Sequence, residues 1–127
     1  MTGRVLVDTS VWVDHFRQRN APLVALLAQD VVLMHPLVLG ELACGTPPSR
    51  AQTLADLQRL QATQQATVRE VIVLVERERL FGLGCGLVDL SLLASALMTP
   101  GATLWTLDRR LATMAERFGI AHRAAVH

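Results

Sequence analysis

The stretch VLVDTSVWV, residues 5–13, joins a short apolar run to a single carboxylate and a pair of hydroxyl residues. Residues 4–7, RVLV, form a short run rich in branched apolar side chains, which predicts a buried strand that ends at Asp8. The Thr-Ser pair that follows supplies good N-cap residues, so a helix carrying Trp12 and Phe16 is expected next. A strand that runs directly into a helix is the first unit of an alternating α/β fold.

The rest of the chain continues this alternation. Strands are predicted over 31–34, 102–106 and 120–123, and helices over 22–28, 37–44, 50–60, 87–98, 109–118 and from a capping box at 67–70 through residue 80. The polar stretch 61–66 fits neither pattern, and the three glycines of GLGCG, residues 82–86, indicate a flexible loop. Strands separated by helices predict an α/β fold with a parallel sheet and helices on both of its faces.

Composition limits the class of protein. A chain of 127 residues without a long linker is the size of one domain, so residues 1–127 are predicted to form a single domain. The net charge of +1 gives no global basic field, and nucleic-acid binding would need a local patch or a metal ion.

No stretch has the pattern of a signal peptide or the length of a membrane helix, which predicts a soluble cytoplasmic protein. Cys44 and Cys85 lie in apolar sequence and are expected to be small buried residues.

Four carboxylates stand isolated in apolar sequence: Asp8, Glu41, Asp89 and Asp108. Carboxylates are rarely buried unless they are paired, hydrogen-bonded or bound to a metal ion. In a parallel sheet the carboxyl ends of the strands share one edge, and ligands bind there. Asp8 and Asp108 follow predicted strands, while Glu41 and Asp89 lie on helices that begin near the same edge. The sequence therefore predicts that all four reach one pocket.

A shared cation explains this grouping most simply. Two carboxylates about 4 Å apart repel by roughly 4 kcal/mol at an effective dielectric constant of 20. Ligands that are all oxygen favour Mg²⁺, with Mn²⁺ as a substitute, over zinc. Such a site suits phosphodiester hydrolysis, because the metal orients a water, lowers its pKa and offsets charge on the phosphate. The four histidines show no metal-ligand spacing, and His35 is expected to be a polar loop residue.

Several of these residues also have plainer explanations. Asp8 and Asp108 each precede a predicted helix and can act as its cap. Ser10 and Thr106, each two residues from an acid, can orient a carboxylate or a water, or simply cap a helix and pack in a strand. The pair Arg109–Arg110 can grip RNA phosphates or belong to a solvated helix face.

Taken together, VLVDTSVWVDHF near the start, GEL at 40–42, VDLSLLASAL and LWTLDRRL resemble a PIN-domain ribonuclease. More narrowly, they resemble the VapC-type toxins of bacterial type II toxin–antitoxin pairs. The resemblance covers essentially the whole chain, and the ordered quartet Asp, Glu, Asp, Asp is its specific part. It implies a three-layer α/β/α sandwich and a Mg²⁺-dependent endoribonuclease that leaves 5′-phosphate and 3′-hydroxyl ends.

The resemblance also implies roles and partners. The four acids of the family fall on Asp8, Glu41, Asp89 and Asp108, with metal contact chiefly at the first and third and the other two completing the pocket. Thr106 matches a threonine two residues before the fourth acid. The implied partners are an RNA substrate, a second copy in a homodimer, and a cognate antitoxin whose C-terminal segment blocks the site.

Other classes of protein fit less well. Phosphoaspartate enzymes, receiver domains and P-loop NTPases use a lysine beside the phosphate, and this chain has no lysine. A catalytically silent PIN-like module that binds RNA or protein remains the alternative. Loss of one acid would favour that alternative, but all four acids are present.

Overall fold

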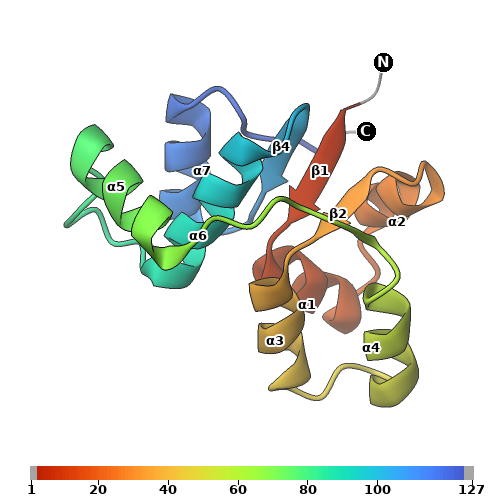
Figure 1. The fold of residues 1–127 in the computed structure, drawn as a ribbon. Helices are drawn as coiled ribbons and strands as arrows, with labels where there is room; N and C mark the ends of the chain where they lie inside the picture. Colours follow the sequence, from red (N-terminus) through yellow and green to blue (C-terminus); the bar gives the residue numbers. More distant parts are fainter. Residues whose placement is uncertain (1–2, 125–127) are drawn as a thin grey trace.

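The chain forms a four-stranded parallel sheet covered by helices on both faces (Figure 1). The structure is a computed structural model, and it describes residues 3–124. In chain order the elements are β1 (Arg4–Val7), α1 (Thr9–Arg17), α2 (Ala21–Ala28), β2 (Val32–Met34), α3 (Pro36–Ala43), α4 (Arg50–Leu57), β3 (Gln61–Ala62), α5 (Val68–Glu78), α6 (Leu87–Met98), β4 (Ala102–Trp105) and α7 (Arg109–Arg117).

The order of the strands explains the three layers. The strands lie in the order β3-β2-β1-β4, so the chain moves outward from β1 through β2 to β3 and then returns to the other side of β1. Crossovers between parallel strands are right-handed, so this reversal places α1 to α4 on one face and α5 and α6 on the other. Figure 1 shows these two groups on either side of the strands, with α7 packed beside α6 and β4. The predicted α/β/α architecture is confirmed.

Two strand predictions need correction. Gln61 and Ala62, inside the stretch that fitted neither pattern, form β3 and pair with β2. Both residues are exposed on an edge strand, so no apolar alternation marks them in the sequence. The strand predicted over 120–123 is wrong, because that segment makes only an isolated bridge between Leu104 and Ala121.

The core lies between the sheet and the helices, and α6 is its most buried helix. Residues 90–96 of α6 are all buried, including two serines. One of them, Ser95, accepts a hydrogen bond from the Ala66 backbone N–H at 3.1 Å and lies 3.0 Å from His35 Nε2. Because the body of α6 is fixed by the core, the first turn of the helix, which carries Asp89, is held at the edge of the sheet.

His35 and the cysteines differ from their predicted environments. His35 is buried rather than a polar loop residue, because it caps α3: its Nδ1 accepts a hydrogen bond from the Leu37 backbone N–H at 3.0 Å. Burial lowers the pKa of His35, which suits a neutral imidazole that joins α3 to α6. Cys44 is exposed at the end of α3 and Cys85 is half-buried in the glycine loop, so the prediction that both are buried is wrong.

Candidate active site

Asp8 lies at the point where the strand order reverses. Val7 pairs with Trp105 in the register of β1 and β4, and the Asp8 backbone N–H donates to the Trp105 carbonyl at 2.9 Å. The carboxyl ends of strands at such a switch point are the usual ligand site of an open parallel sheet. The Asp8 side chain is only 6% exposed, and it caps α1 by accepting from the Ser10 backbone N–H. The cap suggested by the sequence is present, and it holds this carboxylate at the sheet edge.

Two hydroxyl groups fix the orientation of the Asp8 carboxylate. Ser10 Oγ and Thr106 Oγ1 donate to the same oxygen, Oδ2, at 2.7 and 2.8 Å. The hydroxyl oxygens in turn accept from the backbone N–H groups of Leu107 and Asp108, both at 3.0 Å. These backbone donors leave each hydroxyl proton free to point at the carboxylate. Within the described residues, every hydrogen bond to the Asp8 carboxylate goes to Oδ2, so Oδ1 is not engaged.

Asp108 closes the same edge from the start of α7. It is exposed, and its Oδ1 accepts from the backbone N–H groups of Arg110 and Leu111 at 2.9 and 3.1 Å. Asp108 is therefore the helix cap that its position suggested. Its second oxygen takes no part in these two bonds.

Glu41 reaches the site from α3, and a residue that the sequence analysis did not single out holds it. The Thr9 hydroxyl donates to Glu41 Oε1 at 2.6 Å, joining α1 to α3. Local sequence marks Thr9 only as part of a capping pair, because it cannot show a partner 32 residues away. The one available signal was its position directly after Asp8.

Asp89 lies in the first turn of α6 and is partly buried. Burial raises the pKa of its carboxyl, and the negative charges of Asp8, Asp108 and Glu41 raise it further, while a backbone hydrogen bond from Gly86 lowers it. Each of the other three predicted acids therefore lies within electrostatic reach of Asp89.

These acids approach each other without forming a finished ligand set. In the part of the chain that the structure describes, no group of three or more His, Cys, Asp or Glu side chains is arranged to hold a metal ion. Asp8 is buried and fixed by its hydrogen bonds, whereas Glu41 and Asp108 are exposed and are each hydrogen-bonded through one oxygen. The available donors are carboxylate and hydroxyl oxygens, the chemistry that suits a hard cation such as Mg²⁺.

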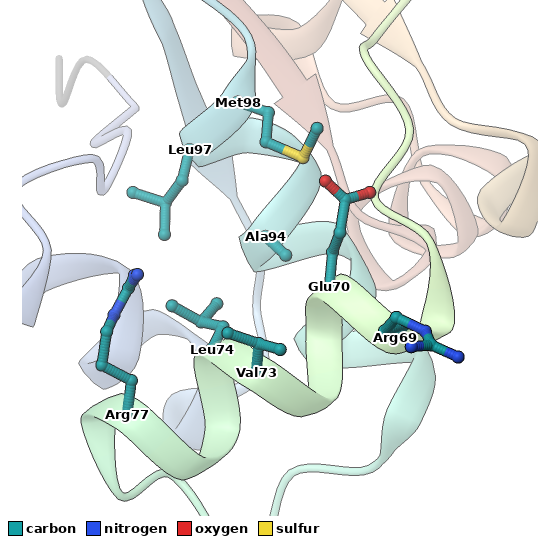
Figure 2. Close-up of a pocket in the computed structure, with 8 residues that line it drawn as sticks. All are labelled: Arg69, Glu70, Val73, Leu74, Arg77, Ala94, Leu97 and Met98. Carbon is teal, nitrogen blue, oxygen red and sulfur yellow. The ribbon is translucent and has the colours of Figure 1, made fainter.

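Two surface grooves of about 410 Å³ lie on different sides of the molecule. One borders the acids: it contains Thr9 and Glu41, with Val13, Phe16 and Arg17 from α1. The other lies between α5 and α6 and contains none of the four acids (Figure 2). Its floor and walls are formed by Val73, Leu74, Ala94, Leu97 and Met98. The second groove is therefore separate from the acid cluster.

The fold and the acids at its switch point define a known class. The family model of the PIN domain matches residues 5–117, and the chain belongs to the PIN domain family. It is similar to Ribonuclease VapC32 of Mycobacterium tuberculosis, in both strain CDC 1551 / Oshkosh and strain ATCC 25618 / H37Rv. In each comparison the two sequences are 45% identical over 117 residues, which is 92% of this chain and 94% of the relative. The resemblance to VapC-type PIN ribonucleases drawn from the motifs is confirmed. Among residues 3–124, no helix has the length and apolarity needed to cross a membrane.

Proposed function

We propose that this protein is a Mg²⁺-dependent endoribonuclease toxin that hydrolyses RNA phosphodiester bonds. The observation that carries the proposal is the gathering of acids at the switch point of a parallel sheet: Thr106 joins the Asp8 carboxylate to the Asp108 backbone, Thr9 holds Glu41 beside Asp8, and Asp89 lies within reach of all three. The two relatives that match almost the whole length of this chain are named as ribonucleases, and the part matched by the PIN domain model includes all four acids. The alternative from a different class is a PIN-like module that binds RNA or protein without cutting it. The absence of a ready ligand cluster in residues 3–124 is the observation that favours that alternative.

The residues that would hold the metal are Asp8 and Asp89, with Asp108 and Glu41 completing the pocket. When bound, Mg²⁺ or Mn²⁺ would lower the pKa of a water and offset charge on the phosphate and on the leaving oxygen. The raised pKa of Asp89 means that metal must compete with a proton at this carboxyl, so metal affinity should increase with pH.

The chain's own hydrogen bonds provide the preorganisation that hydrolysis needs. Ser10 and Thr106 hold Oδ2 of Asp8 and leave Oδ1 for a ligand. Thr9 binds Glu41 by one oxygen, which keeps that flexible side chain beside α1. Outer residues of this kind orient metal ligands and raise the affinity of the site.

Cleavage of total bacterial RNA by the purified protein tests this function. We expect discrete products in Mg²⁺, no products in EDTA, and no products from Asp8→Asn, which removes a ligand charge. Asp56→Asn, an exposed change on α4, is the matched control and should cleave like the unmodified protein. Cleavage by Asp8→Asn at the unmodified rate would refute the site. A folded, antitoxin-free protein that binds RNA without cutting it would establish the silent alternative.

We also propose that the protein pairs with a cognate antitoxin and forms a homodimer. The homodimer is assigned to the exposed face of α5, where Val68, Ile72 and Val73 are between 54% and 57% exposed. Glu70 and Arg77 stand at opposite ends of the adjoining groove, with Arg69 beside Glu70 (Figure 2), so antiparallel α5 helices of two copies would bring Arg77 of each copy to Glu70 of the other. Light scattering after size exclusion should show a dimer that Ile72→Asp converts to a monomer.

Ala51→Asp places the same charge on exposed α4 and is the control for this experiment. It should leave the dimer intact. A dimer that persists in Ile72→Asp would place the contact elsewhere.

A further inference from the structure

Arg110 lies against the backbone of the glycine loop. It is the second residue of α7, and its side chain crosses to Gly84. A Cβ atom on Gly84 would lie 2.7 Å from Arg110 Cδ and 2.9 Å from both Nε and Nη1. Gly84 also has φ of +89°, a conformation that side chains rarely adopt. The backbone conformation therefore favours glycine at this position, and a Cβ there would displace the Arg110 side chain.

This contact joins the two elements that carry the third and fourth acids. Asp108 caps the helix of Arg110, and the glycine loop leads directly into α6 and Asp89. The thiol of Cys85, next to Gly84, shows how close these charges are. Burial raises the pKa of Cys85, Asp89 and Asp108 raise it further, and Arg110 lowers it. The guanidinium is therefore at the border of the acid cluster.

Arg110 is not used to neutralise that cluster. The charged groups that shift the pKa of Asp89 are all carboxylates. Among the described residues, the ion pair that the structure contains joins Arg123 and Glu116 and does not involve Arg110. Arg110 is also exposed, and within residues 3–124 its guanidinium donates no hydrogen bond to the protein, so its donors are available to a ligand.

We propose that Arg110 binds a phosphate of the RNA strand next to the cleavage site and that Gly84 sets its position. This inference rests on the proposed nuclease function and adds a substrate-binding residue to it. A guanidinium presents a rigid fork of donors that matches a phosphate and can bind it by two parallel bonds. RNA that approaches four carboxylates is repelled, and the net charge of +1 gives little attraction from the rest of the molecule. A fixed cation at the border of the acids offsets this repulsion at the place where it is greatest.

The test separates RNA binding from cleavage. Binding is measured by fluorescence anisotropy with labelled single-stranded RNA of randomised sequence in EDTA, and cleavage is measured on total bacterial RNA in Mg²⁺. Arg110→Ala should weaken binding by roughly 10- to 100-fold. It should also reduce the slope of log affinity against log salt concentration by about 1, because one phosphate contact is lost. Arg110→Lys should recover part of the affinity, because it keeps the charge and loses the fork.

Two further variants isolate the geometry. Arg59→Ala removes an exposed arginine between α4 and β3, away from the four acids, and should bind and cleave RNA like the unmodified protein. Gly84→Ala should weaken RNA binding in the unmodified background, because the new methyl group displaces Arg110. In the Arg110→Ala background the same change should add no further loss.

The outcomes distinguish this inference from the proposed function. If the unmodified protein cleaves RNA and Arg110→Ala binds and cleaves like Arg59→Ala, the assignment of Arg110 is wrong and the nuclease stands. If the folded unmodified protein neither binds nor cleaves RNA, both proposals fail. An equal loss from Gly84→Ala in both backgrounds would show that Gly84 acts through its own backbone, which overturns its role in positioning Arg110.

Discussion

Replacement of Thr106 by valine tests the hydrogen-bond network around Asp8, because it removes one hydroxyl and keeps the shape of the side chain. Thr106 Oγ1 donates to Asp8 Oδ2 at 2.8 Å and accepts from the Asp108 backbone N–H at 3.0 Å. A hydrogen bond to a charged group contributes about 1.5–3 kcal/mol and a neutral one about 0.5–1.5 kcal/mol. Thr106 is half-buried, so water replaces part of both, and the expected loss in the free energy of unfolding is about 1–3 kcal/mol.

Thermal denaturation in EDTA measures this loss. At roughly 4 °C per kcal/mol for a domain of this size, Tm should fall by about 4–12 °C. The matched control is Thr113→Val, which removes a hydroxyl bound only to the Arg109 carbonyl on an exposed helix face and should change Tm little.

RNA cleavage should also fall in Thr106→Val, by about 10- to 100-fold, because Asp8 loses an orienting donor. Thr106→Ser should restore most of both properties, since it keeps the hydroxyl. Equal Tm and equal cleavage in Thr106→Val and Thr113→Val would refute the argument that Thr106 orients Asp8.

Three other changes test separate parts of the site and fold. Asp89→Asn should stabilise the metal-free protein. Burial and the neighbouring acids raise the pKa of Asp89 in the folded protein above its usual 3.8. The ionised carboxylate therefore destabilises the folded state once the pH rises above 3.8. The gain in Tm over the unmodified protein, measured in EDTA, should grow from pH 4 to 7, and a constant difference would contradict the repulsion. Thr9→Val should release Glu41 and reduce RNA cleavage more than it reduces Tm, whereas an unchanged cleavage rate would show that the 2.6 Å bond has no part in the site. Thr67→Ala removes the capping box of α5 and should lower the free energy of unfolding, measured by denaturant, by about 1 kcal/mol. RNA cleavage should be unchanged, because α5 carries none of the four site acids.

Much of the fold followed from local patterns in the sequence. The capping box at Thr67 and Glu70 predicted the start of α5, and both of its reciprocal bonds are present. The apolar run before Asp8 predicted β1, and the rule that parallel strand ends share an edge predicted that the acids would lie together. Each of these signals depends on neighbours in sequence or on a general property of parallel sheets.

The features that were missed depend on contacts between distant elements. Thr9 meets Glu41 because α1 packs against α3, and His35 is buried because its side chain, at the end of β2, reaches Ser95 of α6. The strand β3 consists of two exposed edge residues, so its pairing with β2 leaves no apolar period. Sequence periodicity reports which face of an element is buried, but it does not identify the residue that lies opposite.

Titration with Mn²⁺, followed by electron paramagnetic resonance of the free ion, tests most directly whether the four acids form one metal site. We expect saturable binding that Mg²⁺ displaces, that Asp8→Asn and Asp89→Asn abolish, and that Asp56→Asn leaves unchanged. Mn²⁺ binding that is equally strong in Asp8→Asn, Asp89→Asn and the unmodified protein would contradict the assignment of this cluster as the metal centre.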